Sequence, residues 1–312
     1  MTIERFDQAL PQGITLSCRA CGPRDAPLRV LLLHGFPEGA FIWDDVMQRL
    51  GPSVRCVAPN LRGYERSSSP TDVQAYRVKH LVGDIAALIE AMGAPIDLLV
   101  AHDWGGALAW NLAAQRPQLI RQLLILNSPH PATFLRELRD NPAQQVASAY
   151  MNFLCRPDAA ALLAENDFAR LWPFFTNMGG VAWLTDALRA QYRALWQQGL
   201  EGPLNYYRAS PLKPPTSAAD AIHSLVFAPE FVTVRVPTTV LWGEADSALP
   251  LALLDGLEDY VEALDVRRVV GASHWIIHER PALVADTIAQ LIIAGQRRAA
   301  PSGVRSPRGA TP

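Results

Sequence analysis

The chain of 312 residues has no uninterrupted apolar run of the ~18 residues that a membrane-spanning helix needs. Its first residues, MTIERFDQALPQG, include acidic side chains and lack the apolar core of a secretory signal peptide. The formal net charge is only −2, and no long basic run precedes the C-terminus. These absences give no reason to expect nucleic acid or a membrane surface as a partner, and we expect a cytoplasmic protein.

Cysteine is scarce, and its arrangement does not favour a metal site. Of the four cysteines, Cys18 and Cys21 form a single C-x-x-C inside a predicted strand, while Cys56 and Cys155 lie apart. At this spacing in a strand the two side chains point to opposite faces. No second Cys or His pair completes a ligand set, so we expect neither a metal nor a cofactor.

Short apolar segments alternate with amphipathic ones in both the first and the last third of the chain, which predicts a parallel sheet flanked by helices. The predicted strands are residues 12–21, 29–34, 54–59, 96–101, 123–126, 238–241 and 266–270, and the predicted helices are 41–50, 78–92, 104–115 and 281–294. The intervening part contains no convincing strand and is rich in Ala, Leu, Trp and Tyr. We therefore predict a core of residues 1–131 and 229–296, an inserted helical cap of 132–228, and a disordered tail of 297–312.

The segment IDLLVAHDWGGALAWNLAAQ, residues 96–115, organises the rest of the sequence. It predicts a buried strand that turns into a helix within two residues, with Asp103 at the turn. Ala101, Gly105 and Gly106 leave room for a sharp turn, as in the nucleophile elbow of the G-x-S-x-G type. The alternative is that Asp103 only caps the helix, since Asp is a favoured N-cap residue.

Polar residues follow three other predicted strands. The motif HGFPE, residues 34–38, comes after one of them; Asp246 follows a second, where Glu244 competes for the same role. His274 follows the last strand, and His278 is a nearby alternative. Catalytic groups in open α/β sheets gather at the carboxyl ends of strands, and the order nucleophile, acid, histidine is that of the α/β-hydrolases.

A carboxylate at the turn restricts the reaction. Attack by Asp103 on saturated carbon would give a stable alkyl ester, which water can then hydrolyse. His274, oriented by Asp246, would be the general base that activates this water. The backbone N–H groups of Phe36 and Trp104 would bind the oxyanion formed during ester hydrolysis. The leaving group would be either a strained ring oxygen, which needs phenol donors, or a halide, which needs N–H donors.

Taken together, the motifs HGFPE, HDWGG, LNSPHP, WGEAD and SHW resemble those of epoxide hydrolases of the α/β-hydrolase superfamily, relatives of the haloalkane and fluoroacetate dehalogenases. The resemblance implies an α/β-hydrolase fold, with a mostly parallel central sheet flanked by helices and an inserted all-helical cap. It also implies two cap tyrosines that bind the epoxide oxygen. Tyr150 in YMNFLCRP and Tyr207 in GPLNYYR match these positions, whereas adjacent Tyr206 would point elsewhere, because neighbouring helical side chains diverge by ~100°.

Some positions depart from the patterns of the related families. Fluoroacetate dehalogenases carry arginine where this chain has Trp104 and Ala107. Many haloalkane dehalogenases have asparagine at the position of Phe36 and an acid at that of Asn127. These differences favour an epoxide substrate. We expect the substrate site to include Phe36, Pro37, Trp104 and Trp275.

The sequence thus predicts an epoxide hydrolase that forms a vicinal diol through a covalent ester on Asp103, with a small-molecule epoxide and water as its partners. The sequence allows a homodimer without requiring one. Two alternatives stay open. One is a haloalkane dehalogenase with the same nucleophile, in which Trp104 and either Trp172 or Trp183 bind the halide. The other is a non-catalytic binding protein that uses the cap pocket to hold a ligand.

Overall fold

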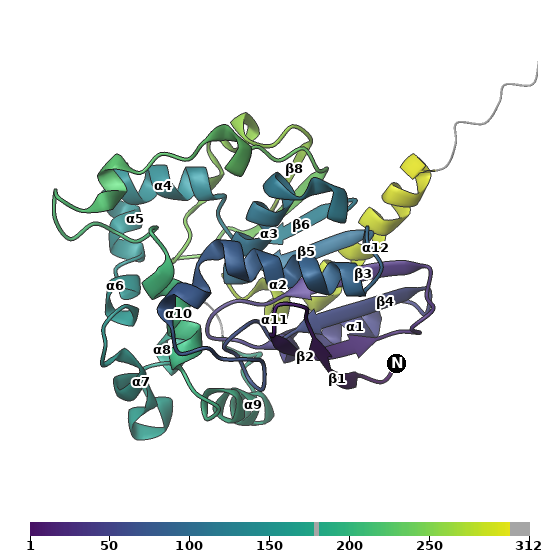
Figure 1. Ribbon diagram of the computed structural model, residues 1–312, viewed down its shortest axis with the longest axis horizontal. Helices are drawn as coiled ribbons and strands as arrows, with labels where there is room; N and C mark the ends of the chain where they lie inside the picture. Colours follow the sequence, from purple (N-terminus) through teal and green to yellow (C-terminus); the bar gives the residue numbers. More distant parts are fainter. Residues whose placement is uncertain (178–180, 300–312) are drawn as a thin grey trace, which may run out of the picture.

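The computed structural model describes residues 1–177 and 181–299, and its centre is one sheet of eight strands in the order β1-β2-β4-β3-β5-β6-β7-β8 (Figure 1). β1 and β2 are antiparallel to their neighbours, and the six strands from β4 to β8 are parallel. The strands are β1 (Glu4–Ala9), β2 (Thr15–Cys21), β3 (Leu28–Leu33), β4 (Val54–Pro59), β5 (Leu98–His102), β6 (Leu123–Leu126), β7 (Thr238–Gly243) and β8 (Leu264–Val269). The predicted mostly parallel sheet is confirmed.

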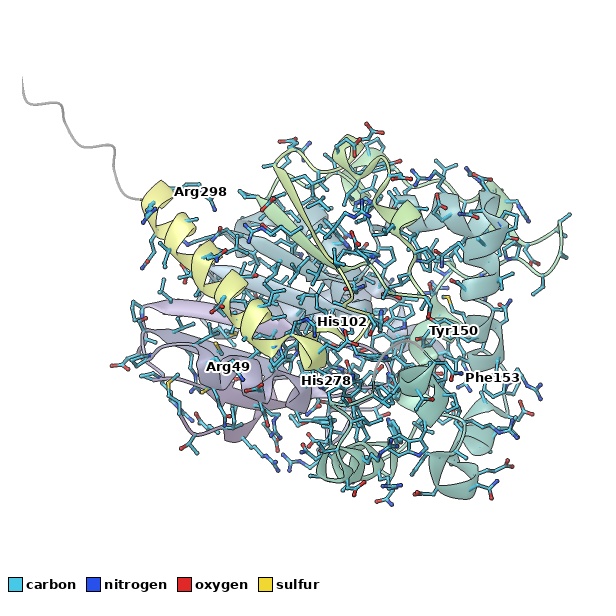
Figure 2. All side chains as sticks on the ribbon, turned by 180° about the vertical axis from the view of Figure 1, so that it is seen from behind. Arg49, His102, Tyr150, Phe153, His278 and Arg298 are labelled. Carbon is cyan, nitrogen blue, oxygen red and sulfur yellow. The ribbon has the colours of Figure 1, made fainter. Side chains whose placement is uncertain are left out.

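Helices cover both faces of the sheet, and its central strands are therefore buried on both sides. One face packs against α2 (Val78–Ala91) and α3 (Asp103–Gln115), and the other against α1 (Asp44–Arg49), α11 (Ile276–Glu279) and α12 (Pro281–Ala299). Figures 1 and 2 view the molecule from these two sides. Cys18 and Cys21 lie in the two different core clusters, so the predicted opposite orientation of their side chains is confirmed.

Between β6 and β7 the described residues form helices and no strand. These helices are α4 (Pro131–Asp140), α5 (Pro142–Ala147), α6 (Tyr150–Leu154), α7 (Ala159–Phe168), α8 (Trp172–Thr176), α9 (Asp186–Trp196) and α10 (Glu201–Ala209). Helices α6 to α10 enclose an aromatic core of their own, into which Phe36 and Trp275 project from the sheet side. The division into core and cap at residues 132 and 228 stays a prediction.

The sequence missed β1, because this edge strand has no fully buried residue and alternates half-buried with exposed side chains, several of them charged. Charged residues at such an edge oppose pairing with other molecules. The strand predicted for 12–21 begins only at Thr15, since residues 10–14 form a turn in which Leu10 N–H donates to the Ile14 carbonyl and Gly13 N–H donates to the Leu10 carbonyl.

The last helix, α12, ends at Ala299, five residues beyond its predicted end at 294. Gln, Arg and Ala are good helix formers, so the helix continues without an apolar face. The disordered tail was predicted to start at residue 297, but residues 297–299 belong to α12. The rest of the predicted tail, 300–312, lies outside the described residues. Among the described helices, none is both long and apolar enough to cross a membrane.

Candidate active site

Asp103 lies at the turn from β5 into α3, with a left-handed backbone at φ 49°. Asp adopts this conformation more readily than most residues. The turn leaves no room for larger neighbours: a Cβ on Gly35 would collide with the Asp103 side chain, and one on Gly105 would lie 2.6 Å from the His34 carbonyl oxygen. A Cβ on Gly106 would collide with the Ser128 side chain. The glycines therefore permit the sharp turn.

The Asp103 side chain does not cap α3, so the alternative interpretation as an N-cap is wrong. Its Oδ1 instead accepts a hydrogen bond of 2.7 Å from the backbone N–H of Phe36, while Ser128 Oγ donates to the Asp103 carbonyl. The loop that carries Phe36 is fixed by His34: Leu61 N–H donates to its Nε2, which leaves Nδ1–H to donate to the Gly35 carbonyl. Asp103 thus faces the loop at the end of β3.

His274 and Asp246 form a buried pair beside Asp103. His274 Nδ1 lies 2.7 Å from Asp246 Oδ2, and its Nε2 lies 3.9 Å from Asp103 Oδ2. Asp246 is held by three further hydrogen bonds: Ala248 N and Leu249 N donate to Oδ1, and Asn127 Nδ2 donates to Oδ2 at 2.8 Å. The carboxylate is therefore fixed in the orientation that holds the His274 ring.

The competing residues are engaged elsewhere. Glu244 pairs with Arg268 at 2.8 Å, and His278 Nε2 donates to Glu38 Oε1 at 2.7 Å. Neither contacts Asp103. The geometry therefore favours Asp246 and His274 as the acid and the histidine of the site.

Asn127 is a functional candidate that the sequence reasoning did not identify. It has φ 37°, and its Oδ1 accepts from Gly243 N, which orients the amide nitrogen toward Asp246. Its place directly after β6, within LNSPHP, was the available signal. Asn127 thus supplies one of the hydrogen-bond donors that the buried Asp246 carboxylate needs.

The charges around His274 determine its protonation state. Burial alone would lower the pKa of His274, but the Asp246 carboxylate, its hydrogen bond and then the Asp103 carboxylate raise the pKa to about 9. The imidazole is therefore protonated at neutral pH in the free enzyme. Part of the increase in the His274 pKa therefore comes from the negative charge of Asp103.

Tyr150 from α6 and Tyr207 from α10 come together over Asp103, with ring centroids 6.3 Å apart. Burial raises the pKa of both phenols, and the negative charge of Asp103 raises it further. Both therefore remain protonated and can donate hydrogen bonds at neutral pH. Tyr206, in contrast, donates its hydroxyl proton to the Arg62 carbonyl at 2.9 Å, as expected from the helical geometry.

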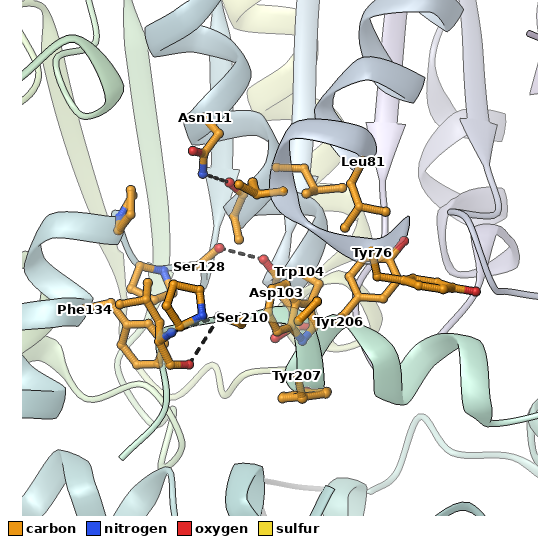
Figure 3. A pocket seen from close by; sticks show the side chains of 18 of the residues that line it. Tyr76, Leu81, Asp103, Trp104, Asn111, Ser128, Phe134, Tyr206, Tyr207 and Ser210 are labelled. Atoms are coloured by element: carbon orange, nitrogen blue, oxygen red, sulfur yellow. Dashed lines mark hydrogen bonds between the residues drawn. The ribbon is translucent and has the colours of Figure 1, made fainter. Parts of the chain in front are cut away.

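Asp103, Trp104, Tyr150 and Tyr207 line a cavity of about 510 Å³ (Figure 3). The other predicted substrate contacts lie outside its lining. The Phe36 ring packs edge-on against Tyr207, with centroids 5.3 Å apart.

Pro37 and Trp275 also face the protein interior. The Pro37 carbonyl accepts from Trp196 Nε1, and buried Trp275 packs edge-on against the His274 ring at 4.9 Å. These residues support the site from behind, because each contacts side chains of the cap or the ring of His274. Sequence position alone did not separate them from residues that line the cavity.

A second polar cluster lies behind His274, and the sequence reasoning did not identify it. Fully buried Glu38 accepts from Tyr192 of α9 at 2.6 Å and lies 2.7 Å from His278. Its other oxygen is 3.5 Å from His102 Nδ1, and His102 Nε2 contacts the His274 carbonyl at 2.9 Å. His102 and His278 are labelled in Figure 2. Although burial alone would raise the pKa of Glu38, the two histidines hold it below its usual range. The cluster connects cap and core at the back of the site.

The described residues contain no group of three or more His, Cys, Asp or Glu side chains arranged to hold a metal ion.

Comparison with known proteins agrees with this geometry. Residues 29–281 match the family described as alpha/beta hydrolase fold. The AB hydrolase superfamily protein YfhM of Bacillus subtilis is 34% identical over 284 residues, covering 90% of this chain and 95% of that protein. Human epoxide hydrolase 4 is 32% identical, and the match covers 88% of this chain and 75% of the human one.

Among solved structures, one from a study of novel epoxide hydrolases in metagenomes from hot environments superposes with a TM-score of 0.84. It is 35% identical in sequence, and the match covers 94% of this chain and 99% of that one. The chain belongs to the α/β-hydrolase fold family. Within that family, its relatives include epoxide hydrolases from animals and bacteria.

Replacing Asp103 with Asn should lower the pKa of His274 from about 9 by roughly one unit, because the variant lacks a negative charge near Nε2. The measurement is an NMR titration of the His274 ring. Glu244→Gln is the matched control, since Glu244 pairs with Arg268 and should leave the titration unchanged. An unaltered His274 pKa in the Asp103→Asn variant would contradict the assigned charge coupling.

Proposed function

We propose that the protein is an epoxide hydrolase that converts an epoxide into a vicinal diol through an alkyl ester on Asp103. The observation that carries this proposal is the pairing of a carboxylate at the turn with two protonated phenols in the same cavity. Asp103 attacks a ring carbon, and the C–O bond of that carbon breaks. Tyr150 and Tyr207 donate hydrogen bonds to the departing oxygen and supply its proton.

The charge on His274 couples the two half-reactions. When Asp103 becomes a neutral ester, the imidazolium loses a neighbouring anion and its pKa falls. A phenol gives its proton to the alkoxide, and the His274 imidazolium then restores the proton of that phenol. Ring opening therefore leaves a neutral imidazole. His274 then takes a proton from water, which attacks the ester carbonyl carbon, while the Phe36 and Trp104 N–H groups stabilise the oxyanion. Release of the diol restores the Asp103 carboxylate and the imidazolium.

The cavity lining favours an epoxide over a halide. Halide binding needs N–H donors, and Trp104 is the single indole among the described residues of the lining. Trp172 donates to the Asp167 carbonyl, and neither Trp172 nor Trp183 is among the described residues that line the cavity, so neither supplies the second donor. A purely binding role would not require the nucleophile, acid and histidine to lie together.

The covalent step predicts that His274→Gln accumulates the ester, because nucleophilic attack survives while water activation is lost. Intact-protein and peptide mass spectrometry after treatment with an aryl epoxide should show Asp103 heavier by one substrate molecule. His223→Gln, at an exposed site in the cap, is the matched control and should show no adduct. Absence of an adduct on Asp103 in the His274→Gln variant would count against the ester.

The phenol roles predict a difference between two adjacent tyrosines. Tyr207→Phe should lower kcat for epoxide opening roughly a hundredfold, the effect typical of removing one oxyanion donor. Tyr206→Phe removes a buried hydrogen bond to Arg62 and should mainly reduce stability, by about 1 kcal/mol.

The same pair of variants separates the two candidate reactions when halide release from an alkyl bromide is measured alongside diol formation. Efficient halide release that is undiminished in Tyr207→Phe, with no diol from epoxides, would favour the dehalogenase instead.

A further inference from the structure

The cavity over Asp103 extends outward to the protein surface. Its inner end is formed by Asp103 and the two phenols, and its walls are mainly apolar side chains of α2, α3 and the cap. In Figure 3 Leu81 and Asn111 lie on the far side of Trp104 from Tyr207, and Phe134 and Ser210 form another wall. A volume of about 510 Å³ exceeds what an epoxide ring alone would fill, since drug-sized ligands occupy pockets of this order.

Charge is distributed unevenly along this cavity. Of the described residues that line it, only three are charged: Asp103 at the inner end, and Arg77 and Lys79. The two cationic residues are exposed, which places them at the mouth. Within the described part of the chain, neither has a carboxylate within 4 Å or a side-chain hydrogen bond, whereas many other arginines are paired. The mouth thus presents two available cations and no anion.

We propose that Arg77 and Lys79 form a subsite for an anionic group at the far end of the substrate. The preferred substrate is then an epoxide on an apolar chain that ends in a carboxylate. The substrate part of this inference rests on the proposed epoxide hydrolysis. The subsite itself concerns binding alone.

The two ends of the cavity determine how such a molecule binds. The Asp103 carboxylate repels a second carboxylate at the inner end, while Arg77 and Lys79 attract it at the mouth. The apolar chain is buried between them against side chains such as Leu81 and Leu108. The epoxide is therefore directed to Asp103, and the reversed orientation is disfavoured at both ends.

The test compares an ω-epoxyalkanoate series with the corresponding methyl esters, which have the same chain and epoxide but lack the charge. The wild-type protein should have the higher kcat/KM on a carboxylate, through KM, and added salt should reduce this preference. In Arg77→Gln/Lys79→Gln, kcat/KM should fall roughly three- to tenfold more for the carboxylate than for the ester, the range that two exposed ion pairs supply.

The control variant Arg5→Gln/Arg116→Gln removes the same charge from exposed positions outside the cavity lining and should leave the carboxylate-to-ester ratio unchanged. An equal loss on both substrates in the Arg77/Lys79 variant, or no preference in the wild type, would overturn the subsite.

A binding measurement separates failure of the subsite from failure of the proposed function. Unreactive alkanoates and the corresponding alcohols are titrated against wild-type and variant protein, with quenching of tryptophan fluorescence as the readout, because Trp104 lines the cavity. Tighter alkanoate binding that depends on Arg77 and Lys79, without turnover of any epoxide, would retain the subsite and reject the hydrolase. If the protein turns over epoxides, but the wild type and the variants bind alkanoates and alcohols equally tightly, the hydrolase is retained and the subsite is rejected.

Discussion

Asp103 has a left-handed backbone where β5 meets α3, and every neighbour of this turn must leave room for its carboxylate. Gly35 does so because it carries no Cβ, and the N–H of Phe36 then reaches the carboxylate oxygen at 2.7 Å. Gly105 lets α3 begin close to the end of β3, because a Cβ there would collide with the His34 carbonyl oxygen. Such a backbone costs on the order of 1–3 kcal/mol and persists only where the surroundings fix it. Here the surroundings are β3, α3 and β5, and all residues of β5 are buried.

The same carboxylate controls the electrostatics of the site. Its negative charge adds to the effect of burial in raising the pKa of the two cap phenols, and to the effect of Asp246 in raising the pKa of His274. In the proposed mechanism, esterification of Asp103 would remove that anion, and the His274 pKa would fall at the stage when a base is needed. Asp246 keeps the imidazole in place, because three hydrogen bonds from other residues hold its own carboxylate.

The sequence was sufficient for features that depend on local pattern. The ends of β5, β7 and β8, which precede Asp103, Asp246 and His274, were predicted to within two residues from short apolar runs, and the fold class followed from the alternation of these runs with helices. Contacts between distant segments could not be predicted in the same way. Glu38 and Tyr192 are 154 positions apart, so no local signal links them.

Solvent exposure of a side chain also depends on tertiary packing, which is why Trp275 was expected to contact substrate and instead supports the His274 ring.

The most direct test of the ester mechanism is a single turnover of an epoxide in ¹⁸O-labelled water with excess enzyme, followed by mass analysis of the diol and of Asp103. The account predicts an unlabelled diol and label in the Asp103 carboxylate, because water attacks the ester carbonyl carbon. A labelled diol and an unlabelled Asp103 would mean that water opens the ring directly and would contradict it.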